Sequence, residues 1–137
     1  MPEQPTRLVI FDDAKEALKR YGETFAEVEC QFLTFRKPIV DEDCEAALVA
    51  FRPHLIIVDL EMGRGRMDGY QLIAQLREVP FRGGVPPIIV CSKFITDSPM
   101  GQGEREAAES QPGVVAAFQK FPSLPTADQF LSHSLPA

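Results

Sequence analysis

Short apolar runs alternate along this chain with longer segments that mix polar and apolar residues. The apolar runs are rich in β-branched and aromatic residues, which favours strands. The predicted strands cover residues 7–11, 28–35, 54–59, 87–91 and 114–120. The run at 54–59 is apolar until it ends in Asp59, a pattern typical of a strand that is covered on both faces in a parallel sheet.

The segments between these runs have the spacing of amphipathic helices. Helices are predicted over residues 14–25, 41–51, 70–79 and 126–134. Thr126 with Gln129 forms a capping-box pattern at the start of the last helix, for which we expect about two turns. Residues 104–110 are helical in propensity, whereas 97–103 resemble a loop. Five strand-then-helix units predict an open, doubly wound α/β sandwich with right-handed crossovers.

The length fits one domain. The chain has 137 residues and a mass of 15.2 kDa, enough for a hydrophobic core but too short for two independent domains. We expect residues 1–6 to form a flexible N-terminal tail and residues 7–137 to form a single domain. Hydrophobic residues make up 45% and charged residues 25% of the chain, which excludes a disordered tail or a fibrous repeat.

Other protein classes are excluded by short motifs and by charge. Unbroken apolar stretches such as residues 46–51, 55–58 and 88–91 fall far short of the roughly 20 residues that a membrane span needs. No secretory signal precedes them, so we expect a cytoplasmic protein. The three cysteines contain no CxxC motif and predict neither a disulfide framework nor a zinc site. A net charge of −6 argues against direct binding of nucleic acid.

Polar residues stand where four of the predicted strands end. Because the carboxyl ends of parallel strands meet at one edge of a sheet, and ligands of doubly wound folds bind there, these residues form the candidate site. They are Asp12, Asp13, Asp59, Ser92 and Lys120.

The chemistry of this set favours phosphoryl transfer. Three carboxylates in one crevice repel one another, and a hard divalent cation, Mg²⁺ above all, would relieve the repulsion. An ammonium group and a hydroxyl beside a cation-bound carboxylate are what a transferred phosphoryl group requires. In this interpretation Asp59 is the nucleophile and forms an aspartyl phosphate.

Five motifs in order along the chain resemble the receiver domain of two-component response regulators. They are LVIFDD, LIIVDLEM, the following MDGYQLI, PIIVCS and GVVAAFQK, and the resemblance spans residues 7–132. It implies a flavodoxin-like fold with a five-stranded parallel sheet of order 2-1-3-4-5 and helices on both faces. It further implies a stand-alone receiver domain that takes a phosphoryl group from a sensor histidine kinase or a phosphotransfer protein. A homodimer and an unidentified downstream protein are the other partners left open.

The resemblance also implies a role for each site residue. Asp59 is the phospho-acceptor, Ser92 donates a hydrogen bond to the phosphoryl group and Lys120 forms its salt bridge. Slow autodephosphorylation is expected rather than the turnover of a conventional enzyme. The implied Mg²⁺ ligands are Asp12, Asp13, Asp59 and the main-chain carbonyl of Glu61.

Several departures from the family pattern support an alternative. The loop after Asp59 is lengthened by the GRGR run of residues 63–66, whose Arg64 and Arg66 are solvated or reach the phosphoryl group. Lys93 stands where the family prefers a very small residue, and its bulk would limit access to Asp59. Ala117 stands where an aromatic switch residue is expected. The alternative is therefore a degenerate receiver that acts as a phosphorylation-independent interaction module.

The segment after Lys120 also differs from the family pattern. Phe121 separates Lys120 from Pro122, so the sequence leaves open whether the cis peptide typical of the family forms there. A small hydrolase with Asp59 as nucleophile is a third hypothesis. It is disfavoured because the general acid of such an enzyme would be an Asp two residues after the nucleophile, and Glu61 stands at that position.

Overall fold

The computed structural model describes residues 4–62 and 66–135, and residues 66 and 67 by their backbone only. The strands are β1 (Thr6–Phe11), β2 (Cys30–Phe35), β3 (Leu55–Val58), β4 (Ile88–Ser92) and β5 (Val114–Gln119). The helices are α1 (Lys15–Thr24), α2 (Glu42–Phe51), α3 (Arg66–Arg77), α4 (Pro99–Glu109) and α5 (Ala127–Leu131). Within the described residues, no helix combines the length and the apolarity that crossing a membrane would need.

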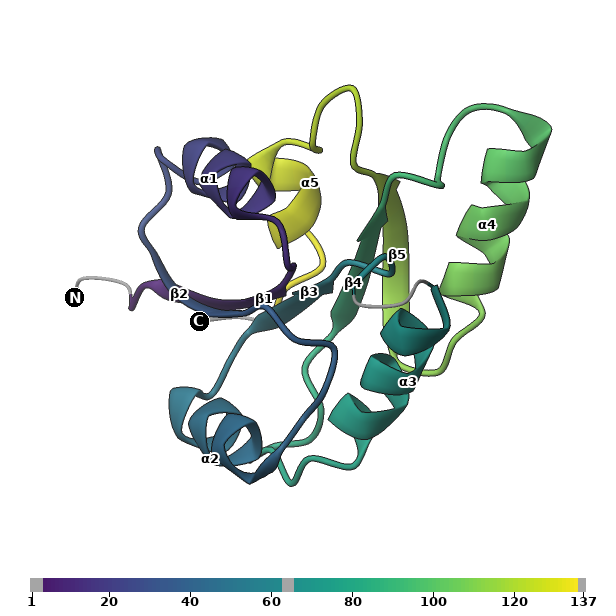
Figure 1. The fold of residues 1–137 in the computed structure, drawn as a ribbon. Coiled ribbons are helices and arrows are strands. Elements are labelled where there is room, and N and C mark those ends of the chain that lie inside the picture. The colour runs from purple at the N-terminus through teal and green to yellow at the C-terminus, as the bar shows by residue number, and fades with distance from the viewer. Residues whose placement is uncertain (1–3, 63–65, 136–137) are drawn as a thin grey trace.

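The five strands form one parallel sheet of order β2-β1-β3-β4-β5. Helices α1 and α5 cover one face of the sheet, and α2, α3 and α4 cover the other (Figure 1). The expected doubly wound sandwich and its strand order are therefore confirmed. β3 and β4 lie in the interior of the sheet and are buried along their whole lengths, which explains why both strands are apolar runs without alternation.

Side chains of β1 divide between two hydrophobic cores. Val9 and Phe11 join the core under α2, α3 and α4, whereas Leu8 and Ile10 join the core under α1 and α5. This division follows from the alternation of side chains along a strand. Because both faces are packed, the carboxyl ends of the central strands are held in fixed positions at one edge of the sheet.

Some element boundaries differ from the sequence-based expectation. α4 begins at Pro99, inside the segment 97–103 that was predicted to be a loop. Ser98 caps this helix by accepting a hydrogen bond from the Gly101 N–H at 3.1 Å, and a proline suits the first turn because its missing N–H needs no partner. The two glycines of this segment lowered the helical propensity enough to hide the start of the helix.

The two ends of the chain also differ slightly from expectation. The capping box of Thr126 and Gln129 is present, but α5 has only five residues instead of about two turns. At the other end, the expected tail of residues 1–6 lies partly outside the described residues, and Thr6 already pairs with Cys30 in the sheet.

Candidate functional site

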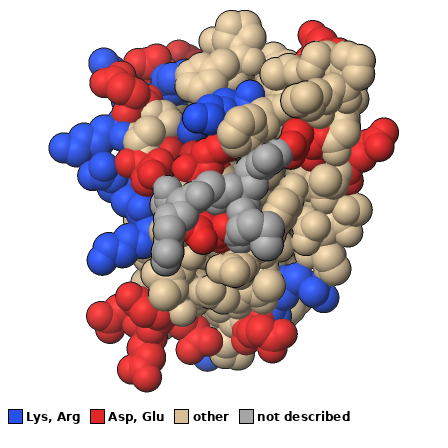
Figure 2. Space-filling model, turned by 45° about the vertical axis from the view of Figure 1, so that its right-hand side comes forward, with Lys and Arg blue, Asp and Glu red and all other residues tan. Residues whose placement is uncertain are grey.

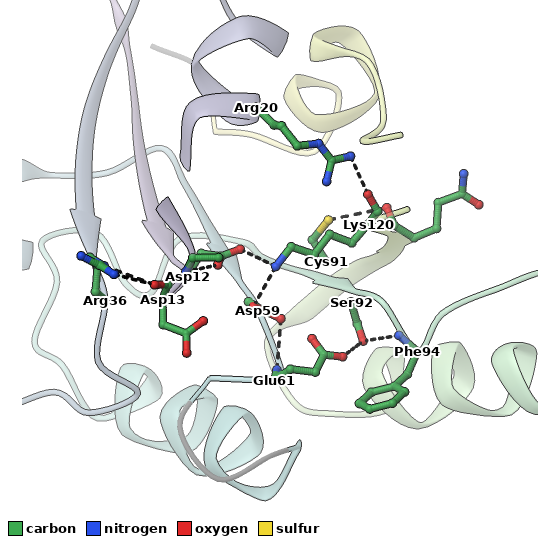
Figure 3. Close-up of polar contacts among 12 residues, drawn as sticks. Asp12, Asp13, Arg20, Arg36, Asp59, Glu61, Cys91, Ser92, Phe94 and Lys120 are labelled. Atoms are coloured by element: carbon green, nitrogen blue, oxygen red, sulfur yellow. Dashed lines mark hydrogen bonds and ion pairs between the residues drawn. The ribbon is translucent and has the colours of Figure 1, made fainter. Parts of the chain in front are cut away.

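The polar residues predicted at the strand ends lie together at the carboxyl edge of the sheet (Figure 3). Asp12 follows β1, Asp59 follows β3, Ser92 ends β4 and Lys120 follows β5. Two backbone hydrogen bonds extend the sheet into the site: Asp59 N–H donates to the Phe11 carbonyl at 2.9 Å, and Lys120 N–H donates to the Ser92 carbonyl at 3.1 Å. The sheet itself therefore positions the site residues.

Lys120 forms two buried ion pairs. Its Nζ lies 2.7 Å from Asp12 Oδ2 and 2.9 Å from Asp59 Oδ2. The three residues are almost fully enclosed, with exposed fractions of 6% for Lys120, 0% for Asp12 and 2% for Asp59. At this degree of burial, one ammonium group bridges carboxylates from two different strands.

This ammonium does not fully compensate the buried negative charge. Burial, and next the carboxylate of Glu61, raise the pKa of Asp59 to about 6 despite its contact with Lys120. Burial likewise raises the pKa of Asp12. Burial alone would lower the pKa of Lys120, but the hydrogen bond to Asp12 and the charge of Asp59 outweigh it and raise that pKa. The site therefore has a surplus of negative charge that a further cation would relieve.

Three carboxylates are placed to hold such a cation. Asp12, Asp13 and Asp59 each offer an oxygen, and these oxygens all lie within 4.8 Å of one another. An all-oxygen donor set suits Mg²⁺, and the exposed position of Asp13 leaves room for the waters that this ion retains. The residues present fit the implied metal. Acidic side chains also gather around the middle of the face shown in Figure 2, beside the grey residues.

Backbone contacts fix the acidic loop after β1. The Ala14 N–H donates to Asp12 Oδ1 at 3.0 Å, which leaves Oδ2 for Lys120. Arg36 donates to the main-chain carbonyl of Asp13 from Nε at 3.2 Å and from Nη2 at 2.9 Å. These contacts orient both aspartates without occupying the side chain of Asp13.

The main chain of Lys120 is also held in place, by a contact with α1. The Arg20 guanidinium of α1 donates to the Lys120 carbonyl at 2.8 Å and lies over the Phe121 ring, 4.8 Å from its centroid. The Phe121–Pro122 peptide bond that follows is cis. The cis bond that the sequence left open therefore forms one residue later than the resemblance implies, between Phe121 and Pro122.

One contact was not foreseen. The Ser92 hydroxyl donates a hydrogen bond to Oε1 of Glu61, and the Phe94 N–H donates to Ser92 Oγ at 3.0 Å. The other oxygen of Glu61, Oε2, is buried and has no hydrogen-bond partner among the described residues. From the sequence, Glu61 was expected to offer its main-chain carbonyl to the metal, and its side chain was weighed only as the general acid of a hydrolase. The acidic residue two places after Asp59, in the turn that follows β3, was the available signal.

The residues at which the sequence differs from the receiver-domain pattern lie in different parts of the structure. Lys93 is exposed, and its Nζ lies 5.4 Å from the centroid of the Phe94 ring. Ala117 is buried in the core under α2, α3 and α4. Phe118, one residue later, points to the opposite face, where its ring packs against Phe130. The aromatic side chain nearest to the expected position therefore lies on the other side of the sheet. Arg64 and the side chain of Arg66 lie outside the described residues.

Comparisons by sequence alone find no match, either to a protein-family model or to a curated protein. Solved structures of the same fold are found. A response regulator receiver protein from Burkholderia phymatum is 23% identical, with a TM-score of 0.62 over 86% of this chain and 84% of that chain. A CheY-like receiver domain from Methylobacillus flagellatus is 17% identical, with a TM-score of 0.60 over 87% and 88% of the two chains.

A third solved structure of this fold holds a metal. It is the Mn²⁺-bound form of the response regulator Rcp1, which is 17% identical, with a TM-score of 0.61 over 88% of this chain and 84% of that chain. At these identities the likeness shows the fold, and fold alone does not determine function. The chain has the fold of response regulator receiver domains.

Proposed function

We propose that this chain, which has the receiver-domain fold, accepts a phosphoryl group onto Asp59 with Mg²⁺ as its cofactor. The donor is a sensor histidine kinase or a histidine phosphotransfer protein. The observation that carries the proposal is the pairing of buried Lys120 with Asp59 beside the further carboxylates of Asp12 and Asp13. The metal in the Mn²⁺-bound relative of the same fold supports a cation at this acidic edge.

The transfer is a displacement at phosphorus. A carboxylate oxygen of Asp59 forms the new O–P bond while the N–P bond of the donor phosphohistidine breaks, and the electron pair of that bond stays on the imidazole nitrogen. Lys120 balances negative charge on the transferring group, and the Ser92 hydroxyl donates to one of its oxygens. A Mg²⁺ ion held by Asp12, Asp13 and Asp59, with the Glu61 carbonyl, would neutralise further phosphoryl charge. We expect the aspartyl phosphate to hydrolyse slowly.

The proposal is tested by incubating the full chain with acetyl phosphate, which replaces the protein donor, in the presence and absence of Mg²⁺. Intact mass is expected to show one added phosphoryl group in the presence of Mg²⁺ only, and peptide mapping is expected to place it on Asp59. The variant Asp59→Asn is expected to gain none. A folded wild-type protein that stays unmodified, or a variant that is modified as fully as the wild type, would overturn the proposal.

A second function is favoured by one specific contact. Glu61 already accepts the hydrogen bond of Ser92 that a phosphoryl group would need. If this contact is permanent, the chain is a degenerate receiver that binds partners without phosphorylation. The two functions are separated by measuring the affinity for a candidate partner with and without acetyl phosphate. A phosphorylation-dependent change in affinity favours the phospho-receiver, and equal affinity favours the interaction module.

A further inference from the structure

The hydroxyl of Ser92 is fully committed in the unmodified protein. Ser92 is completely buried, its proton is donated to Glu61, and its oxygen accepts from the Phe94 N–H. A hydroxyl has only one proton to donate. Ser92 therefore cannot donate to a phosphoryl oxygen while it donates to Glu61.

The ammonium group of Lys120, the second hydrogen-bond donor of the site, already has partners too. Lys120 Nζ contacts both Asp12 and Asp59, so both side-chain donors predicted to bind the phosphoryl group, Lys120 and Ser92, already have partners in this arrangement (Figure 3). Glu61 lies in the turn after β3 and places its carboxylate between the side chains of Asp59 and Ser92. The Glu61 N–H donates to Asp59 Oδ1 at 3.0 Å, which ties the two residues together.

From this geometry we infer that the Glu61 carboxylate is a built-in competitor for the phosphoryl subsite. It holds Ser92 in the unmodified protein and must leave before Ser92 can bind a phosphoryl oxygen. This inference rests on the proposed function, because it concerns the regulation of the same site.

Two properties of Glu61 make the exchange feasible. Its carboxylate is held by a single side-chain hydrogen bond, and Oε2 is buried without a partner among the described residues. A buried carboxylate oxygen without a partner is unfavourable. The side chain as a whole is only half-buried, so a rotation can return the carboxylate to water. A phosphoryl group, which brings about −1.5 to −2 charges, would also repel this carboxylate.

The test measures the affinity for beryllium fluoride, a phosphoryl mimic, by ¹⁹F NMR at saturating Mg²⁺. Glu61→Ala removes the competitor, and its affinity is expected to be about tenfold higher than that of the wild type, the worth of one hydrogen bond to a charged group. Glu61→Gln keeps the length and the acceptor oxygen but loses the charge, so an intermediate affinity is expected. The matched control is Glu78→Ala, which removes the same charge from an exposed position after α3 and is expected to match the wild type.

A double-mutant comparison separates competition for Ser92 from a general structural effect. In a Ser92→Ala background, Glu61→Ala is expected to give little further gain, because the shared donor is gone. In the wild-type background without beryllium fluoride, Glu61→Ala is expected to shift the Phe94 amide resonance, whereas Glu78→Ala leaves it in place. The amide readout reports the contact itself and does not depend on phosphorylation.

Equal beryllium fluoride affinity of the wild type and Glu61→Ala would overturn this inference and leave the proposed function standing. A gain that is equally large in the Ser92→Ala background would also overturn it. If neither the wild type nor Glu61→Ala binds beryllium fluoride while both stay folded, the inference and the proposed function fall together.

Discussion

At the scale of single residues, the site is defined by an imbalance of charge. Lys120 supplies one positive charge to the buried carboxylates of Asp12 and Asp59, and the exposed Asp13 stands beside them. Burial, and next the neighbouring Glu61 carboxylate, raise the pKa of Asp59 from its ordinary 3.8 to about 6, which outweighs the pairing with Lys120. The Asp59 carboxylate is therefore held in the folded protein at a cost in stability.

This imbalance predicts that Asp59→Asn stabilises the metal-free protein at pH 7. Between pH 3.8 and about 6 the folded protein binds more protons than the unfolded chain, so the stability contributed by Asp59 falls as pH rises through that range. The full shift corresponds to about 3 kcal/mol, part of which is lost because Lys120 gives up a partner. We expect a gain of about 1–3 kcal/mol in the free energy of unfolding by urea.

The pH dependence supplies the control for this prediction. Near pH 4 the Asp59 carboxyl of the wild type is protonated in the folded state, so the two proteins are expected to differ little there. An Asp59→Asn variant that is less stable than the wild type at pH 7 would contradict the account.

Lys120 is also important for stability, because it pairs with two buried carboxylates. Lys120→Ala leaves two buried carboxylates without their ammonium, and breaking a buried ion pair in this way costs about 3–5 kcal/mol. Exposed Lys93, at the same edge of the sheet, provides the matched control, and Lys93→Ala is expected to stay within about 0.5 kcal/mol of the wild type. Urea unfolding in the absence of Mg²⁺ checks both values, and equal stabilities of the two variants would refute the structural role of Lys120.

At the scale of elements, two glycines of α4 have opposite roles. A Cβ on Gly101 would lie 2.1 Å from Thr96 Oγ1 and 2.4 Å from the Thr96 nitrogen, whereas a Cβ on Gly103 would meet nothing within 4 Å. The close approach to Thr96 joins the start of α4 to the loop after β4. Gly101 is therefore needed for packing, and Gly103 is not.

The matched pair Gly101→Ala and Gly103→Ala tests this difference within one helix. Gly103→Ala is expected to stabilise the protein by about 0.5–1 kcal/mol, because alanine is the better helix former. Gly101→Ala is expected to destabilise it by about 1–3 kcal/mol, because backbone atoms must shift. Thermal unfolding checks both signs, and a stabilising Gly101→Ala would show that α4 does not pack against Thr96 in this way.

The elements also show which parts of the fold are predictable from sequence. β3 and β4 were predicted because a strand covered on both faces must be apolar throughout, and this pattern is visible in LIIV and IIVCS. The start of α4 was missed because glycine disfavours helices on average. Gly101 is required there by its close approach to Thr96, and this contact leaves no pattern in the sequence and is visible only in three dimensions.

The same distinction holds for the candidate site. The convergence of Asp12, Asp59, Ser92 and Lys120 was predictable, because parallel strands present their carboxyl ends at one edge and each of these residues ends or directly follows a strand. The contact between Glu61 and Ser92 was not, because a side-chain rotamer in a loop leaves no periodic signal. The predicted functional roles of these residues remain predictions.

At the scale of the whole molecule, His54 ties together segments from three parts of the chain. Its Nδ1 accepts a hydrogen bond from the Arg7 N–H at 2.8 Å, and its carbonyl accepts from the Leu135 N–H at 3.0 Å. Burial, and next the charge of Arg7, lower the pKa of His54. The amino edge of the sheet, opposite the candidate site, therefore depends on a neutral imidazole.

This arrangement predicts a loss of stability in mild acid. Below the ordinary pKa of 6.5 the unfolded chain binds a proton on His54 that the folded protein excludes, so stability falls as pH drops through and below 6.5. Above that value both states are neutral and His54 adds no pH dependence. Urea unfolding between pH 5 and pH 8 is expected to show a smaller dependence of this sign in His54→Gln than in the wild type. The same slope in both proteins would assign the effect to other groups.

The whole molecule also carries a net charge of −6, and the candidate site concentrates part of that negative charge at one edge of the sheet. A cation bound there would reduce the repulsion within the site and between the site and a phosphoryl group. Binding of Mg²⁺ and binding of a phosphoryl group are therefore expected to support one another.

The central claim is that the carboxyl edge of the sheet is a Mg²⁺-dependent phosphoryl-acceptor site. The most direct measurement is heteronuclear NMR of the full chain, titrated first with Mg²⁺ and then with beryllium fluoride. We predict that Mg²⁺ shifts resonances of Asp12, Asp13 and Asp59, and that beryllium fluoride then shifts those of Ser92 and Lys120. A well-folded spectrum that neither addition changes at these residues would contradict the claim and favour a phosphorylation-independent interaction module.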